Sequence, residues 1–176
     1  GLELLAFPAE TPGIMEDASG RPNGLLGDRA NNEAFGRFGT YFGTDARAME
    51  MVDAAVGRAH AVGITTLHAL EGGEGRDNRD AEAFLERIPS LPLRFVFYYQ
   101  ITDVGRVVNL GLPRIGGCIL LDGDVGPRTA ALSEPYVDDP DCFGTLYYTQ
   151  DEVDAFVLEA HRAGLQVAMH AVGDAA

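Results

Sequence analysis

The sequence predicts an α/β fold with a parallel sheet, and three observations support this prediction. Predicted helices and strands alternate between residues 44 and 171. The predicted strands are largely apolar, which suits strands buried on both faces of a parallel sheet. Connections from helix to strand are short, whereas those after strands are long, and the longest runs from Leu121 to Thr149. Long loops after strands are typical of a (β/α) barrel, where the chemistry lies at the carboxyl ends of the strands.

Four helices are predicted from capping residues, apolar periodicity and helix breakers. The first is capped by Thr44, carries apolar residues at helical spacing and ends at Gly63. The second ends before Pro89, and in the fourth Thr149 and Glu152 form a capping box. The predicted ranges are 44–63, 78–88, 102–109 and 149–164.

Four strands are predicted between these helices, over residues 64–70, 93–99, 115–121 and 165–171. A closed barrel takes eight strands and ~250 residues, so four strands cannot close one. We therefore predict a partial (β/α)8 TIM barrel with about four βα units over residues 44–176. Residues 1–43 are rich in Gly, Pro, Asn and Phe and are predicted as an irregular insertion or lead-in segment, with turns between residues 15 and 31.

The composition excludes several classes of partner. The net charge is −14, so nucleic acid and anionic membranes are not expected partners, because phosphate binding needs clustered Lys and Arg. No apolar run approaches the ~20 residues that span a bilayer. The two cysteines, Cys118 and Cys142, cannot form a disulfide framework, and reduced thiols in a cytoplasmic protein are the expectation.

His170 is the first candidate for chemistry. An apolar strand delivers it at its carboxyl end, and Gly173 and Asp174 begin a turn soon afterwards. It is either a hydrogen-bonded structural histidine or a ligand or base presented by an α/β enzyme. Asp174 is expected to cap a following helix or to orient an imidazole. Cys118 is either a small buried hydrophobe or a thiolate facing a metal, since thiolate and imidazole both suit zinc.

The segment 122–130 is rich in glycine and lies between charged residues. Its Asp-Gly-Asp start suggests a calcium loop, but Gly126 and Ser133 stand where that loop needs an oxygen ligand and a Glu. The calcium interpretation therefore fails. No nucleotide-binding or serine-hydrolase motif occurs in the chain either.

The same segment can instead hold carboxylate and backbone groups near a ligand, so Asp122 and Arg128 are candidates for lining a substrate pocket. His68 is a third candidate, because it ends the first predicted strand as His170 ends the last. A hydrogen bond from His68 to a neighbouring loop is the alternative interpretation.

Together these motifs resemble the metal-dependent amidohydrolase superfamily, and most closely the branch that includes N-substituted formamide deformylase. The resemblance rests on residues 122–136 and on the His-Ala-Val-Gly-Asp run at 170–174. Residues 17–31 and 63–68 fit the same branch, so the likeness spans nearly the whole chain. It implies a (β/α)8 barrel with one or two divalent metals, commonly zinc, which activate a water to attack an amide-like carbon.

In that family a His-x-His pair on the first strand, a bridging Lys on the fourth, histidines on the fifth and sixth and an Asp on the eighth build the site. The resemblance makes His170 the fifth-strand ligand. The Lys position, four residues before Asp122, is Cys118, which would substitute as a ligand or leave a site for one metal. No His-x-His occurs, and strands six and eight are missing. The chain is therefore expected to be an internal barrel segment that does not bind zinc tightly alone.

The sequence thus predicts a segment of a hydrolase that cleaves C–N bonds of amides or N-formyl compounds with metal-activated water. Its expected partners are a small amide-like substrate and the remainder of the barrel, in the same polypeptide or in a second chain. No catalytic residue is assigned here, because the proton-shuttling Asp is expected beyond this chain. The alternative is a non-catalytic α/β module that binds a small ligand or partner through residues 122–130.

Overall fold

The structure is a computed structural model and describes residues 13–26, 30–31, 34, 45–73 and 78–176. The chain divides into two compact units, Gly1–Ala54 and Ala55–Ala176, and each is described by itself. The domain boundary predicted between residues 43 and 44 lies outside the described residues and stays a prediction, as does the cap at Thr44.

The first unit contains an antiparallel hairpin of β1 (Ile14–Glu16) and β2 (Pro22–Leu26). The prediction of irregular structure here was therefore wrong for part of the segment. The connecting turn is held by Asp17, whose carboxylate accepts the backbone N–H groups of Ser19 at 2.8 Å and Arg21 at 3.1 Å. Both strands are mostly exposed, so they lack the apolar alternation from which a half-buried strand is recognised.

The second unit is built on a four-stranded sheet, ordered β3-β4-β5-β6, in which every neighbouring pair is parallel. The parallel sheet predicted from the sequence is confirmed. Each strand lies within one or two residues of its predicted range. The strands are β3 (Thr66–Glu71), β4 (Arg94–Tyr99), β5 (Arg114–Leu120) and β6 (Gln166–His170).

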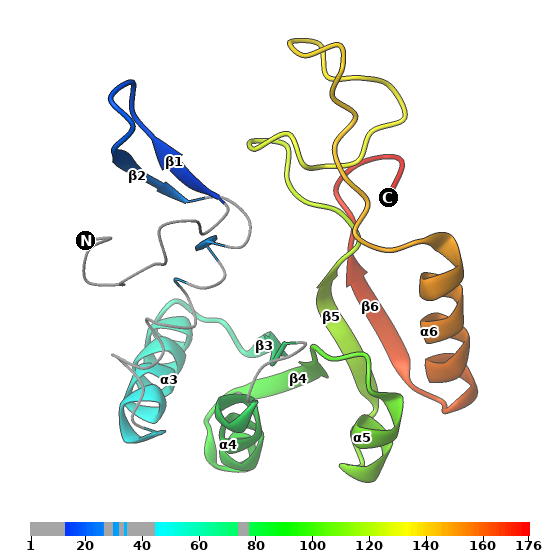
Figure 1. Cartoon of the computed structure of the whole chain (residues 1–176). Helices are drawn as coiled ribbons and strands as arrows, with labels where there is room; N and C mark the ends of the chain where they lie inside the picture. Colours follow the sequence, from blue (N-terminus) through cyan, green and yellow to red (C-terminus); the bar gives the residue numbers. More distant parts are fainter. Residues whose placement is uncertain (1–12, 27–29, 32–33, 35–44, 74–77) are drawn as a thin grey trace. The chain divides into compact units, whose positions relative to one another are not determined.

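The four predicted helices are confirmed as well. They are α3 (Asp45–Ala61), α4 (Arg79–Arg87), α5 (Val104–Asn109) and α6 (Gln150–Arg162), and a 3-10 turn, η1 (Ile88–Ser90), follows α4. The capping box at the start of α6 forms as predicted, since Glu152 accepts the N–H of Thr149 at 2.8 Å and the Thr149 hydroxyl accepts the N–H of Glu152 at 3.4 Å. Figure 1 shows α4, α5 and α6 on one side of the sheet.

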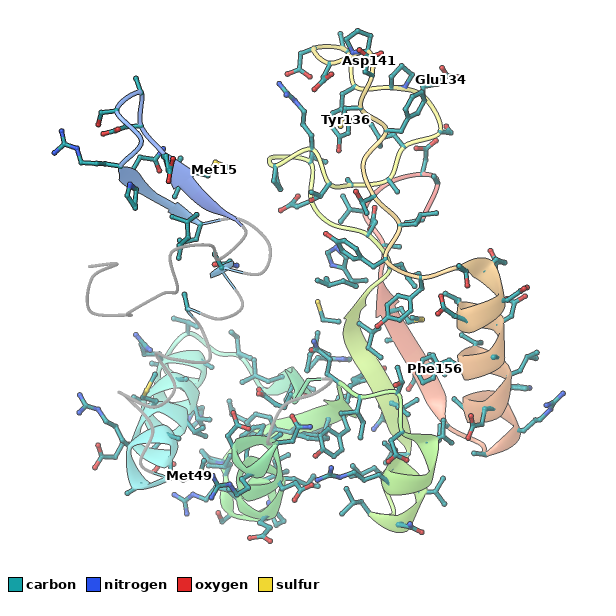
Figure 2. All side chains as sticks on the ribbon, viewed as in Figure 1. Met15, Met49, Glu134, Tyr136, Asp141 and Phe156 are labelled. Carbon is teal, nitrogen blue, oxygen red and sulfur yellow. The ribbon has the colours of Figure 1, made fainter. Side chains whose placement is uncertain are left out.

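Aromatic side chains hold the helices against that side of the sheet. Phe84 of α4 meets Phe95 of β4 edge to face, with ring centroids 5.3 Å apart, and Phe97 lies 6.3 Å from the same ring. On α6, Phe156 lies on the side that faces β6 (Figure 2). Alternate residues of β4 point to the other face, because successive side chains of a strand alternate.

The long connection from β5 to α6 contains no helix or named strand. It leaves the carboxyl end of β5, extends away from the sheet and returns to the start of α6 (Figure 1). Tyr136 lies within this connection, and its hydroxyl donates to the carbonyl oxygen of Ala130 at 3.0 Å (Figure 2). No helix formed by the described residues is long and apolar enough to cross a membrane.

Candidate metal site

The candidate site lies at the carboxyl ends of β5 and β6. His170 is the last residue of β6 and pairs with Leu120 of β5. The carbonyl oxygen of His170 accepts the N–H of Leu121 at 2.9 Å, so the two strands stay paired up to this point. This is the end of a parallel sheet at which α/β proteins gather their chemistry.

Two neighbours fix the imidazole of His170. Its Nε2 lies 3.1 Å from the carbonyl oxygen of Gly123. A carbonyl oxygen only accepts, so in the neutral ring Nε2 carries the proton and Nδ1 keeps its lone pair. Nδ1 lies 3.8 Å from the Sγ of Cys118. The basic nitrogen of the ring is therefore on the side of the thiol.

An irregularity in β5 brings Cys118 to this position. Gly116 and Gly117 have φ values of +84° and +108°, and the register against β6 shifts between Gly116 and Leu120. A Cβ at Gly116 would lie 2.2 Å from the carbonyl oxygen of Ala168, so only glycine fits there. Bulges of this kind re-aim the side chains near active sites. Here the shifted strand carries the thiol of Cys118 to the imidazole at the end of β6.

Asp122 is fully buried and accepts hydrogen bonds from two separate segments. Its carboxylate accepts the N–H groups of Val172 at 2.9 Å and Gly173 at 2.7 Å, and that of Ala131 at 2.8 Å. Burial acts to raise the pKa of Asp122, but these three hydrogen bonds and the nearby His170 hold that pKa below its ordinary value. The carboxylate thus fixes the backbone that directly follows His170.

Asp174 ties the same turn to the long connection. It accepts hydrogen bonds from the hydroxyl of Ser133 and from its backbone N–H, the latter at 3.0 Å. These bonds, led by that of the hydroxyl, lower the pKa of Asp174. The sequence suggested a helix cap or a partner for an imidazole, whereas the described contacts of this carboxylate join two loops. Asp122, whose Oδ1 lies 4.0 Å from Nε2 of His170, is the carboxylate nearer the ring.

The other sequence candidates have partners of their own. His68 was expected at the end of its strand, but it lies in the middle of β3 (Thr66–Glu71). Its ring stacks on Tyr98 of β4, with ring centroids 6.3 Å apart and an interplanar angle of 21°. The guanidinium of Arg128 bonds to Asp138 at 2.7 Å and to Asp139 at 3.4 Å. The substrate-binding roles expected from the sequence stay predictions for all three candidates, His68, Asp122 and Arg128.

The donors present fit a pair of metal ligands. Nδ1 of His170 and Sγ of Cys118 face each other, and a histidine that ligates a metal usually donates its other N–H to a carbonyl or carboxylate, as His170 does to Gly123. Asp122 adds no third ligand, since its oxygens accept backbone N–H groups. Within the described ranges, no three His, Cys, Asp or Glu side chains form a group that would hold a metal ion. Catalytic zinc sites use three protein ligands, so a complete centre needs residues beyond these two.

Sequence reasoning missed three contributors to this geometry. The consecutive glycines Gly116 and Gly117 inside an apolar strand are a recognisable signal of a bulge. The carbonyl of Gly123 leaves no signal, because every residue has one. Ser133 meets Asp174 from 41 residues away, and nothing local in either residue indicates the other.

Known proteins are similar to this chain in sequence and in fold. The amidohydrolase family model matches residues 6–176, and the chain therefore belongs to the amidohydrolase family. Protein LONG AFTER FAR-RED 3 of Arabidopsis thaliana is 28% identical over 181 residues, which cover 93% of this chain and 31% of that protein. The putative amidohydrolase YtcJ of Bacillus subtilis (strain 168) is 27% identical over 179 residues, covering 93% of this chain and 32% of YtcJ. The chain thus spans about a third of the length of these curated relatives.

Two solved structures are similar over 99% of this chain. An uncharacterised metal-dependent hydrolase from Pyrococcus horikoshii OT3 superposes with a TM-score of 0.75 at 25% identity, and 36% of it is covered. A second, from Pyrococcus furiosus, gives a TM-score of 0.74 at 24% identity with 37% covered, and supports the fold alone. The parallel four-stranded sheet is consistent with part of an amidohydrolase α/β barrel.

Proposed function

We propose that this chain is a segment of a metal-dependent hydrolase that cleaves C–N bonds of amides, N-formyl compounds or related groups. The family match supports hydrolysis, and one observation of the site carries the proposal. His170 presents an unprotonated Nδ1 at the carboxyl end of β6 while the carbonyl of Gly123 holds its Nε2–H. A divalent cation bound there, zinc among the candidates, would acidify water and polarise the substrate carbonyl.

The residues of this chain hold and position that centre. His170 is the proposed ligand, Gly123 fixes its tautomer and Asp122 fixes the backbone after it. We propose further that the fold is part of a (β/α)8 barrel, and that the activity is most similar to that of N-substituted formamide deformylase. A catalytic zinc site uses three protein ligands, and the described residues offer two. The remainder of a barrel, in the same polypeptide or in a second chain, would supply further ligands and the Asp that moves the proton.

The test is metal analysis of the protein together with its hydrolytic activity. We expect a bound divalent metal, and release of formate from N-substituted formamides once the complete barrel is present. His170→Ala should lose both metal and activity, whereas His161→Ala, on the exposed end of α6, should keep both. Activity without metal would reject the metal-dependent mechanism. Metal content that His170→Ala leaves unchanged, together with no hydrolytic activity, would reject the proposal in favour of the non-catalytic module that binds through residues 122–130.

A further inference from the structure

We propose that Cys118 is a thiolate ligand, and that Cys118 and His170 together select a thiophilic divalent cation such as Zn²⁺, Co²⁺ or Cd²⁺ over Mg²⁺ or Mn²⁺. This inference rests on the proposed function, because it requires that a metal lies at the carboxyl ends of β5 and β6. It goes further by naming the class of cation that this chain's own atoms prefer. The separation of the two donor atoms, the bond to Gly123 and the bulge in β5 carry it.

The distance between the two donor atoms suits a single bound ion. Sγ of Cys118 and Nδ1 of His170 are 3.8 Å apart. Zinc bonds imidazole nitrogen at ~2.0–2.1 Å and thiolate sulfur at ~2.3 Å, so one ion bound to both atoms would subtend an angle of roughly 120° between them. That angle is close to tetrahedral. Both atoms therefore reach one ion without movement of either strand.

The hydrogen bond from His170 to Gly123 orients the imidazole for a ligand on the side of Cys118. It places the proton on Nε2, 3.1 Å from the carbonyl oxygen, and leaves the Nδ1 lone pair on the side of Cys118. A histidine whose outer nitrogen is held this way is oriented before any ion arrives. The bond to Gly123 alone requires this tautomer, so the feature that favours a ligand role is the position of the free Nδ1, 3.8 Å from the Sγ of Cys118.

The environment of the thiol differs from that of a small buried hydrophobe, which is the alternative role for Cys118. Ile115 and Ile119, the buried apolar residues of the same strand, have only 0% and 5% of their surface exposed. Cys118 is only partly buried, and its neighbour is an imidazole whose side chain is 27% exposed. The Gly116–Gly117 bulge turns the thiol toward this accessible polar neighbour.

The choice of cation follows from the chemistry of the donors. Thiolate is a soft ligand that favours zinc and related ions, and imidazole also suits them, whereas Mg²⁺ and Mn²⁺ prefer carboxylate, carbonyl and water oxygens. The nearest carboxylate, that of Asp122, is occupied by backbone N–H groups. The described donors of this site therefore offer sulfur and nitrogen.

The experiment is a titration of the protein with Co²⁺, followed by absorption spectroscopy. A cobalt–thiolate bond gives a near-ultraviolet charge-transfer band. We expect this band in the wild type and in Cys142→Ser, and its loss in Cys118→Ser. Cys142 is the matched control, since its Sγ bonds to the carbonyl of Arg128 instead of an imidazole. Cys118→Ser should also weaken Cd²⁺ binding about 10-fold or more, the scale seen when even supporting partners of metal ligands are removed.

A second measurement needs no variant and covers the case in which Cys118→Ser fails to fold. Alkylation of the two thiols of the wild type is followed peptide by peptide with mass spectrometry. Stoichiometric Cd²⁺ should slow alkylation of Cys118 but not of Cys142, and Mg²⁺ should slow neither. Equal protection of both thiols, or of neither, would overturn the inference.

These experiments distinguish failure of the proposed role of Cys118 from failure of the proposed hydrolase function. Metal binding that depends on His170 but gives no thiolate band, and that persists in Cys118→Ser, would overturn the role of Cys118 and leave the proposed function intact. Failure of every cation to bind in a manner that depends on His170 would overturn both.

Discussion

The carboxylate of Asp122 joins parts of the chain that are far apart in sequence. It accepts the N–H of Ala131 from the long connection and those of Val172 and Gly173 from the turn after β6. The next residue, Gly123, bonds to the ring of His170. One dipeptide thus positions both the backbone and the tautomer of the candidate ligand.

Replacing Asp122 should therefore destabilise the protein strongly. Asp122→Ala leaves three N–H groups without their acceptor, and a buried unsatisfied donor costs roughly 1–3 kcal/mol, so the free energy of unfolding should fall by about 3 kcal/mol or more. Urea unfolding measures this. The free energy of unfolding of Asp122→Asn, which keeps one acceptor oxygen, should lie between those of the wild type and Asp122→Ala.

The control for this prediction is Asp141→Ala, at an exposed carboxylate in the long connection (Figure 2). It should change the free energy of unfolding by no more than about 0.5 kcal/mol. Equal effects at Asp122 and Asp141 would show that the hydrogen bonds of Asp122 are not structural.

Glu71, the last residue of β3, gives a prediction about pH. Burial, and then repulsion from Asp80, raise the pKa of Glu71 above its ordinary value. The folded state therefore holds the proton more tightly than the unfolded chain does. The resulting stabilisation is fully present below the ordinary pKa and is lost as the pH rises through the raised one.

Glu71→Gln removes this titration. The variant should lose less of its unfolding free energy than the wild type does as the pH rises through that window, which urea unfolding at a series of pH values measures. Asp80→Asn should give a smaller change in the same direction, because it removes only the second cause. Wild-type and Glu71→Gln curves that run parallel across the window would contradict the assignment.

Among the elements, those with local signals were predictable and those without them were not. The capping box of Thr149 and Glu152 and the apolar pattern of residues 93–99 depend on neighbours in sequence, so α6 and β4 were predicted within a residue or two. The hairpin of β1 and β2 was missed because its strands are exposed. At the site, His170 and Cys118 were predicted as candidate ligands, but the contact between them depends on a bulge and on strand pairing that no local pattern sets.

The turn after β6 packs against the long connection so closely that Gly173 has no room for a side chain. A Cβ there would lie 1.8 Å from the carbonyl oxygen of Ala131. Gly173→Ala should lower the free energy of unfolding by about 2 kcal/mol, since overpacking typically costs ~1–3 kcal/mol. The matched substitution is Gly57→Ala in α3, where a Cβ meets nothing within 4 Å.

Gly57→Ala should raise the stability by roughly 0.5–1 kcal/mol, because alanine restricts the unfolded chain and suits a helix interior. Thermal unfolding compares the two variants directly. A neutral Gly173→Ala would mean that the turn and the connection are not packed as tightly as the structure shows.

For the molecule as a whole, charge complicates any metal measurement. The net charge of −14 attracts every divalent cation to the surface, including Mg²⁺. This attraction is diffuse and is screened as salt shortens the Debye length from about 30 Å at ~0.01 M to about 8 Å at ~0.15 M. Direct bonds from the Sγ of Cys118 and the Nδ1 of His170 act over ~2 Å and are screened much less.

Salt should therefore separate the two kinds of binding. Between about 0.01 M and about 0.15 M NaCl, equilibrium dialysis should show Mg²⁺ binding fall steeply, while the cobalt–thiolate band at a fixed Co²⁺ concentration changes little. Cys118→Ser should make Co²⁺ behave like Mg²⁺, because only the diffuse attraction and a single imidazole remain. Wild-type Co²⁺ binding that falls with salt as steeply as Mg²⁺ binding would mean that the cation is held by the overall charge of the protein, and that Cys118 and His170 form no coordinating pair.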